Sequence, residues 1–257
     1  MASFNSSGGT RINYRLTGSG PPPMVFIHGW CSNLRHWDAQ ARHFQRSHRV
    51  LRMDRPGFGR SGGADQPHTW RQQADIIAEL MRSKRIRNAV VAGHAGGTGT
   101  ALELAARHSD RVHAIVIIDG APGPGMSVAE ARAQPFAQQL AGDGYDETLE
   151  TAYRSYFSEL TAPDIVDDAV ADAVRTPQHV AVREIEQIRS TNTISAAKRI
   201  RQPALWIVAE NSGLTPERVR EHVPQARFGR TVGSAHFVQI DVPDQVNAMI
   251  GRFVRGL

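Results

Sequence analysis

The sequence predicts an α/β fold, a mostly parallel sheet flanked by helices, because short apolar runs alternate along the chain with stretches of helical periodicity. Six runs have the length and apolar character of buried strands: residues 23–27, 49–53, 89–92, 113–118, 204–209 and 226–232. Three further stretches have helical spacing of apolar residues or residues typical of a helix start: 70–82, 97–108 and 242–254.

Residues 121–197 interrupt this alternation. The segment opens with Ala-Pro-Gly-Pro-Gly and then carries only helical patterns, at residues 147–160, 164–174 and 179–188. We therefore predict a helical cap at 121–197, inserted between two strands of a core formed by residues 1–120 and 198–257.

Composition excludes several classes of protein. With 257 residues, 40% of them hydrophobic, the chain can bury a large core and is not disordered. The net charge of +5 is spread along the chain, so no nucleic-acid partner is predicted. The most apolar runs are far shorter than the ~20 residues of a membrane span, and the N-terminus lacks the pattern of a secretory signal. Cys31 is the one cysteine, which favours the cytoplasm, and the 11 histidines lack metal-ligand spacing, so neither a metal nor another cofactor is predicted.

One stretch resembles a nucleophile elbow, the strand–turn–helix motif G-x-S-x-G. Gly93-His94-Ala95-Gly96-Gly97 follows a predicted strand and opens a predicted helix, which is the context that this motif requires. Its glycines suit the tight turn of the helix over the strand. The position of the nucleophilic serine, however, is occupied by Ala95.

Three other motifs occur in register with this one. His28-Gly29-Trp30 ends a strand, and the backbone N–H groups of Trp30 and Gly96 would be the two donors of an oxyanion hole, with His28 orienting the loop. The turn Asp54-Arg55-Pro56-Gly57-Phe58-Gly59-Arg60-Ser61 follows the next strand, and His236 lies in a loop before the last helix. From about Thr10 to its end, the chain thus resembles the α/β-hydrolase fold family.

In that family the chain order is nucleophile, acid, histidine, and two positions here can supply the acid. After the strand at 204–209, where the family usually has aspartate, the chain offers Glu210 and then Ser212. Asp119 ends the strand that follows the elbow and is the preferred candidate, with Glu210 as the alternative. Asp119 would fix the tautomer of His236, which could then act as a general base.

Within the fold, the sequence most resembles the cofactor-independent dioxygenases that cleave the ring of 3-hydroxy-4(1H)-quinolones. The resemblance rests on His28-Gly29-Trp30-Cys31, on Asp119, and on His236-Phe237-x-x-Ile240-Asp241-Val242-Pro243-Asp244. It implies that a His/Asp dyad deprotonates the 3-hydroxyl group, and that the resulting anion reacts with O2 and expels carbon monoxide. The base would be His236 and its partner Asp119, with Trp30 contacting a small aromatic substrate and His94 a candidate to hold its carbonyl oxygen.

Two other interpretations of Ala95 remain open. In one, Ala95 replaces the nucleophilic serine of an esterase or lactonase, and the motif would otherwise be an ordinary G-H-S-G-G elbow. In the other, the chain is a non-catalytic binder of small hydrophobic ligands. The presence of both His236 and Asp119 argues against a binder, which has no need of an oriented base.

Overall fold

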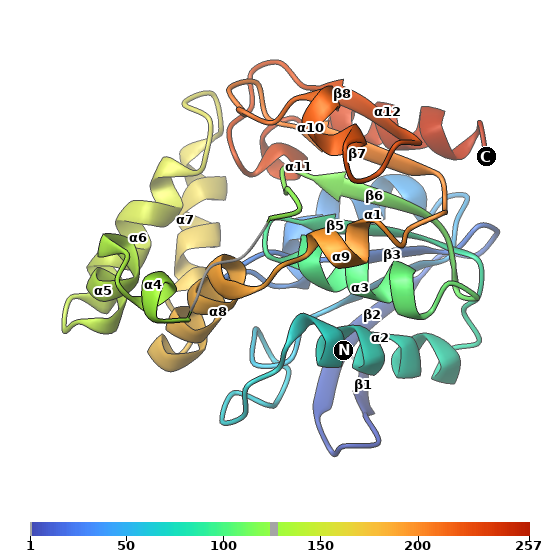
Figure 1. Cartoon of the computed structure of the whole chain (residues 1–257). Helices are drawn as coiled ribbons and strands as arrows, with labels where there is room; N and C mark the ends of the chain where they lie inside the picture. Colours follow the sequence, from blue (N-terminus) through green and yellow to red (C-terminus); the bar gives the residue numbers. More distant parts are fainter. Residues whose placement is uncertain (1, 124–127) are drawn as a thin grey trace.

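The computed structural model describes residues 2–123 and 128–257, and its centre is an eight-stranded sheet (Figure 1). The strand order is β1-β2-β4-β3-β5-β6-β7-β8. The strands are β1 (Ala2–Asn5), β2 (Arg11–Thr17), β3 (Met24–Ile27), β4 (Val50–Met53), β5 (Ala89–His94), β6 (Val112–Ile118), β7 (Ala204–Val208) and β8 (Ala226–Arg230). Strands β3 to β8 pair in parallel, whereas β1 and β2 are antiparallel to their neighbours. The predicted fold class, with its mostly parallel sheet, is therefore confirmed.

Strands β1 and β2 are absent from the strand predictions because neither is a continuous apolar run. β1 is largely exposed at the sheet edge, and β2 buries Ile12 and Tyr14 between polar residues. The six predicted strands overlap β3 to β8. Strands β3 to β7 are apolar over most of their length, as expected for a parallel sheet covered on both faces, whereas the edge strand β8 is only partly buried.

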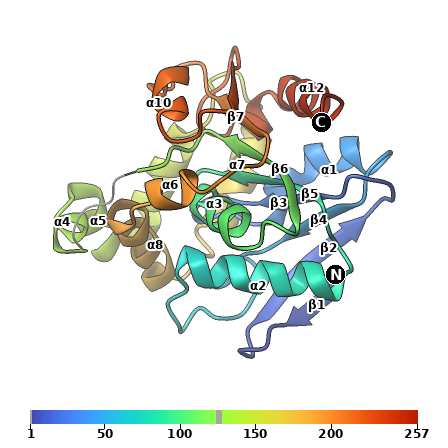
Figure 2. The same cartoon turned by 45° about the vertical axis from the view of Figure 1, so that its right-hand side comes forward.

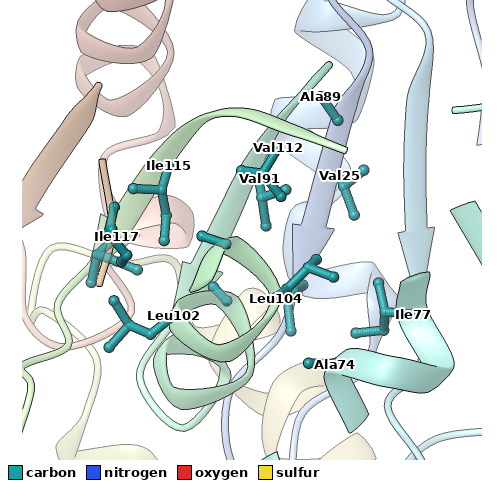
Figure 3. Close-up of a cluster of buried hydrophobic side chains, with 14 of the residues drawn as sticks. Val25, Ala74, Ile77, Ala89, Val91, Leu102, Leu104, Val112, Ile115 and Ile117 are labelled. Carbon is teal, nitrogen blue, oxygen red and sulfur yellow. The ribbon is translucent and has the colours of Figure 1, made fainter. Parts of the chain in front are cut away.

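Helices cover both faces of the sheet (Figure 2). One face carries α2 (Trp70–Ser83), α3 (Gly97–Arg107), α9 (Ile194–Ala197) and α10 (Pro216–Arg220); the other carries α1 (Asp38–Phe44) and α12 (Pro243–Val254). Figure 3 shows part of the first layer, where Val25 and Val91 of the sheet pack with Ile77 of α2 and Leu104 of α3. α2 begins with a capping box formed by Thr69 and Gln72.

Five helices between β6 and β7 lie beyond one end of the sheet (Figure 1). They are α4 (Val128–Arg132), α5 (Pro135–Ala141), α6 (Tyr145–Ser155), α7 (Pro163–Ala173) and α8 (Gln178–Ser190). A third apolar cluster joins them to the core through Trp30, Cys31, Phe58 and Phe237. Residues 124–127 of the segment predicted as a cap lie outside the described residues, and α9 packs against α3 in the core layer.

Two short helices lie near the junction of the core and these five helices. The 3-10 helix η1 (Leu34–Trp37) follows the His-Gly motif, and α11 (Val238–Asp241) follows His236. Within the described residues, no helix combines the length and the apolar character needed to cross a membrane.

Candidate active site

The elbow lies where β5 turns into α3, with a left-handed backbone at its centre. Ala95 has φ of +47°, its N–H donates to the carbonyl of Ile118 at 3.1 Å, and its carbonyl accepts from the N–H of Thr98 at 2.9 Å. A Cβ atom at Gly97 would lie 2.5 Å from the carbonyl oxygen of His28, so only glycine fits there. The chain thus forms the strained turn that normally presents a nucleophile, with a methyl group in the nucleophile's position.

The structure brings His236 and Asp119 together. The Nδ1–H of His236 donates to Oδ2 of Asp119 at 2.7 Å, and Oδ1 of Asp119 accepts the N–H of Ala209 at 3.0 Å. Burial raises the pKa of Asp119, but the hydrogen bonds from His236 and Ala209 outweigh this effect and hold the pKa below its usual value. Asp119 is therefore ionised at neutral pH, and Nε2 of His236 is the nitrogen that can accept a proton.

Glu210, the alternative acid, is directed elsewhere. Its Oε2 accepts the N–H of Gly233 at 2.9 Å, so it fixes the turn that precedes His236 rather than the imidazole. Of the two carboxylates, only Asp119 bonds to the ring of His236 in the described structure.

His94 is buried beside the loop that carries His236. Its imidazole is buried, and burial together with the neighbouring His236 lowers its pKa to about 3, so the ring is neutral. Its Nε2–H donates to the carbonyl oxygen of His236 at 2.9 Å. This bond holds the loop of His236, and His94 is not among the residues that line the cavity beside that loop.

The two expected oxyanion donors lie next to each other. A Cβ atom on Gly96 would be 3.4 Å from the amide nitrogen of Trp30, which places the two residues in contact. Neither N–H donates to any protein acceptor in the described part of the chain. Both amides are therefore available to a bound oxygen atom.

His28 makes the contacts that its expected orienting role requires. Its Nε2 accepts the backbone N–H of Arg55 at 2.8 Å, so the ring proton is on Nδ1 and donates to the carbonyl oxygen of Gly29 at 2.9 Å. Burial and the charge of Arg55 lower the pKa of His28, which keeps the ring neutral. The imidazole thereby ties the oxyanion loop to the turn after β4.

A cavity of about 290 Å³ opens onto these groups. Its walls are mostly apolar or aromatic, and its lining residues include Trp30, Trp70, Ala95, Gly96, Thr98, Asp119, Tyr156, Ile185, Ile188, Thr193 and His236. Neither lysine nor arginine is among the described residues that line it. The cavity suits a small, neutral and largely apolar molecule.

Sequence reasoning missed several residues of this wall, including Trp70, Thr98 and Ile188. The available signal for Trp70 was Gly99, a glycine inside a helix, because a Cβ atom there would lie 2.1 Å from the Trp70 ring. No sequence pattern distinguishes Ile185 and Ile188 from ordinary apolar residues of α8.

An oriented imidazole, two unpaired amides and a strand–elbow–helix turn are the parts of an α/β-hydrolase site. The chain belongs to the alpha/beta hydrolase fold family, whose model matches residues 22–243. The match is to the fold of the family and does not identify the reaction.

Similar proteins carry several activities. The chain is 31% identical over 163 residues, 63% of its length, to a non-heme haloperoxidase of Rhodococcus erythropolis, and 28% identical over 166 residues, also 63%, to a bifunctional esterase/perhydrolase of Acinetobacter calcoaceticus. These matches span 59% and 60% of the two relatives. The enol-lactonase of Burkholderia xenovorans LB400 has the same fold, with a TM-score of 0.84 and 24% identity over 99% of this chain and all of that one.

Proposed function

We propose that this protein hydrolyses a small neutral ester or lactone, with His236 activating a water molecule. The observation that carries the proposal is the pairing of His236 with Asp119 beside two unpaired amides and a methyl group at position 95. A base and an oxyanion hole are thus present together, but the side-chain nucleophile is absent.

The residues fit a direct addition of water. Nε2 of His236 removes a proton from water while the oxygen bonds to the carbonyl carbon, and the N–H groups of Trp30 and Gly96 stabilise the negative charge on the carbonyl oxygen. As the carbonyl re-forms, the bond to the alkoxide breaks and the alkoxide takes the proton from His236. Asp119 stabilises the imidazolium that exists between the two proton transfers.

The proposed substrate class follows from the cavity and the relatives. An aromatic or short acyl ester fits a 290 Å³ space walled by Trp30, Trp70 and Ile188, and the described lining has no lysine or arginine to bind a carboxylate. The esterase/perhydrolase similarity supports acyl chemistry.

A panel of aryl esters and lactones, followed by release of the acid product, tests the proposal. We expect slow but enzyme-dependent hydrolysis without a burst, no acyl-protein in the mass spectrum, and loss of activity in His236→Ala. Equal rates for the wild type and His236→Ala would contradict it.

A second candidate is the ring-cleaving dioxygenase. It is favoured by the same dyad without a nucleophile, because deprotonation of an acidic hydroxyl needs only His236 and Asp119. Oxygen uptake and release of carbon monoxide with a 3-hydroxy-4-quinolone, without hydrolysis of any ester, would favour this candidate over hydrolysis.

A further inference from the structure

We propose that the buried ion pair between Arg55 and Glu184 positions and polarises the oxyanion hole. The inference rests on the hydrolytic function proposed above, because it concerns the groups that would stabilise the oxyanion. Arg55 follows β4 in the core, whereas Glu184 lies on α8. Nη2 of Arg55 and Oε1 of Glu184 are 2.7 Å apart, and the two side chains are 0% and 5% exposed.

The peptide between Gly29 and Trp30 is the link to the oxyanion hole. Its carbonyl oxygen accepts two hydrogen bonds, from Nη2 of Arg55 at 2.7 Å and from Nδ1 of His28 at 2.9 Å. The N–H of Trp30 belongs to the same planar unit, so fixing the carbonyl also fixes the direction of this N–H. A charged donor on the carbonyl also polarises the amide, which makes its N–H a stronger donor to an oxyanion.

Glu184 contacts the residue that carries the second donor. A Cβ atom on Gly96 would lie 2.6 Å from Oε1 of Glu184, so the carboxylate packs against the Cα of Gly96. The Glu184 carboxylate is therefore in direct contact with Gly96, and it is connected to the Trp30 N–H through Arg55. Consequently, the docking of α8 and the geometry of the hole are linked.

The charges of the pair also matter. An isolated carboxylate beside Gly96 would repel a developing oxyanion, and Arg55 neutralises it. Nη1 of Arg55 also donates a hydrogen bond to Oε1 of Gln73 on α2 at 3.1 Å, which further fixes the guanidinium group. The pair thus presents an oriented donor to Gly29 without adding net charge.

The double variant Arg55→Met/Glu184→Met tests this role. A buried ion pair can be replaced by apolar side chains of similar volume without loss of folding, and the net charge stays the same. The probe is phenylphosphonate, a tetrahedral anion, titrated into 15N-labelled protein. In the wild type we expect the amide resonances of Trp30 and Gly96 to shift on binding. In the double variant we expect at least ~10-fold weaker binding, no Trp30 shift, and a kcat at least ~10-fold lower with little change in KM.

The matched control is Arg35→Met. Arg35 of η1 also joins the core to a helix between β6 and β7, through ion pairs of 3.0 Å to Asp168 and Asp172 on α7, but it does not touch the oxyanion loop. We expect it to keep the phosphonate affinity and the Trp30 shift. If the control and the double variant lose binding equally, the pair only docks the helices and the inference is overturned.

Arg55→Lys provides a second variant in case the double variant does not fold. Its single ammonium group keeps the ion pair but cannot reproduce the three guanidinium contacts, so we expect the same loss of the Trp30 shift. An unchanged shift in either variant, or no shift in the wild type, overturns the inference whatever the enzymatic activity. If the wild type shows the shift but hydrolyses no ester, the proposed function fails and this inference stands.

Discussion

The left-handed backbone at Ala95 shows that the elbow geometry does not depend on a serine. A residue with a Cβ atom at φ of +47° carries a cost of roughly 1–3 kcal/mol, which the surrounding packing must offset. Asp119 carries a similar cost at φ of +41°. Both residues line the same cavity, whereas Cys31, Arg85 and Asn88, which also have a left-handed backbone, do not line it.

The strained turn predicts that Ala95→Ser gains a nucleophile with little rearrangement. We expect turnover of aryl esters to rise by several decades, because removing the nucleophile from such a triad typically costs about a millionfold. A burst of alcohol release and an acyl-protein mass would identify the covalent route. The control is Ala95→Ser/His236→Ala, in which turnover should not rise. A folded Ala95→Ser protein with unchanged turnover would show that the oxyanion hole or the base is misplaced.

The hydrogen bond between Asp119 and His236 predicts that replacing Asp119 lowers activity, because the tautomer of His236 changes. In Asp119→Asn, the amide can donate to Nδ1 and so stabilise the tautomer in which Nε2 carries the proton and cannot act as a base. We expect kcat to fall by up to about 10⁴-fold while the fold is retained. The rate should be compared with that of Glu210→Gln, which lacks contact with the imidazole and should retain the wild-type rate; equal losses in both variants would refute the assignment of the acid.

At the level of elements, the sequence predicts what is periodic or apolar, but not contacts between distant segments. Strands β3 to β7 and the elbow are visible because burial on both faces and a tight turn constrain the residue types. The sequence also shows that His236 lies in a loop before the last helix. The contact between Arg55 and Glu184 is not, because it depends on how α8 docks against the core, and a charged residue on a helix normally indicates a solvated face.

The junction of β5 and α3 predicts a position-specific effect of adding one methyl group. In Gly97→Ala, the Cβ atom would lie 2.5 Å from the carbonyl oxygen of His28, so α3 must move away from β3. We expect the free energy of unfolding to fall by about 1–3 kcal/mol, measured by urea denaturation. Gly213→Ala is the control, because no atom lies within 4 Å of its Cβ position; a similar loss there would contradict the steric argument.

At the level of the whole molecule, three imidazoles, two of them buried, lie where the core meets the helices between β6 and β7. The rings of His36, His94 and His236 all contact Phe237, with centroid distances of 5.3, 5.3 and 5.8 Å. Burial lowers the pKa of His94 to about 3 and that of His36 to about 4. The neutral rings of His36 and His94 make the folded state sensitive to acid, because the unfolded chain would protonate them first.

The lowered pKa of His36 predicts how the free energy of unfolding changes with pH. Its folded pKa of about 4 lies below the unfolded value of 6.5, so between these pH values the unfolded chain binds more protons and stability decreases as the pH falls. Since neither ring nitrogen has a hydrogen-bond partner among the described residues, His36→Leu should remove this dependence without breaking a hydrogen bond. We expect the loss of unfolding free energy between pH 7 and pH 4, from urea titrations, to be smaller by about 3 kcal/mol in the variant. His43→Leu, on the exposed side of α1, should leave the pH profile unchanged; a parallel profile in His36→Leu would show that His36 is not the group responsible.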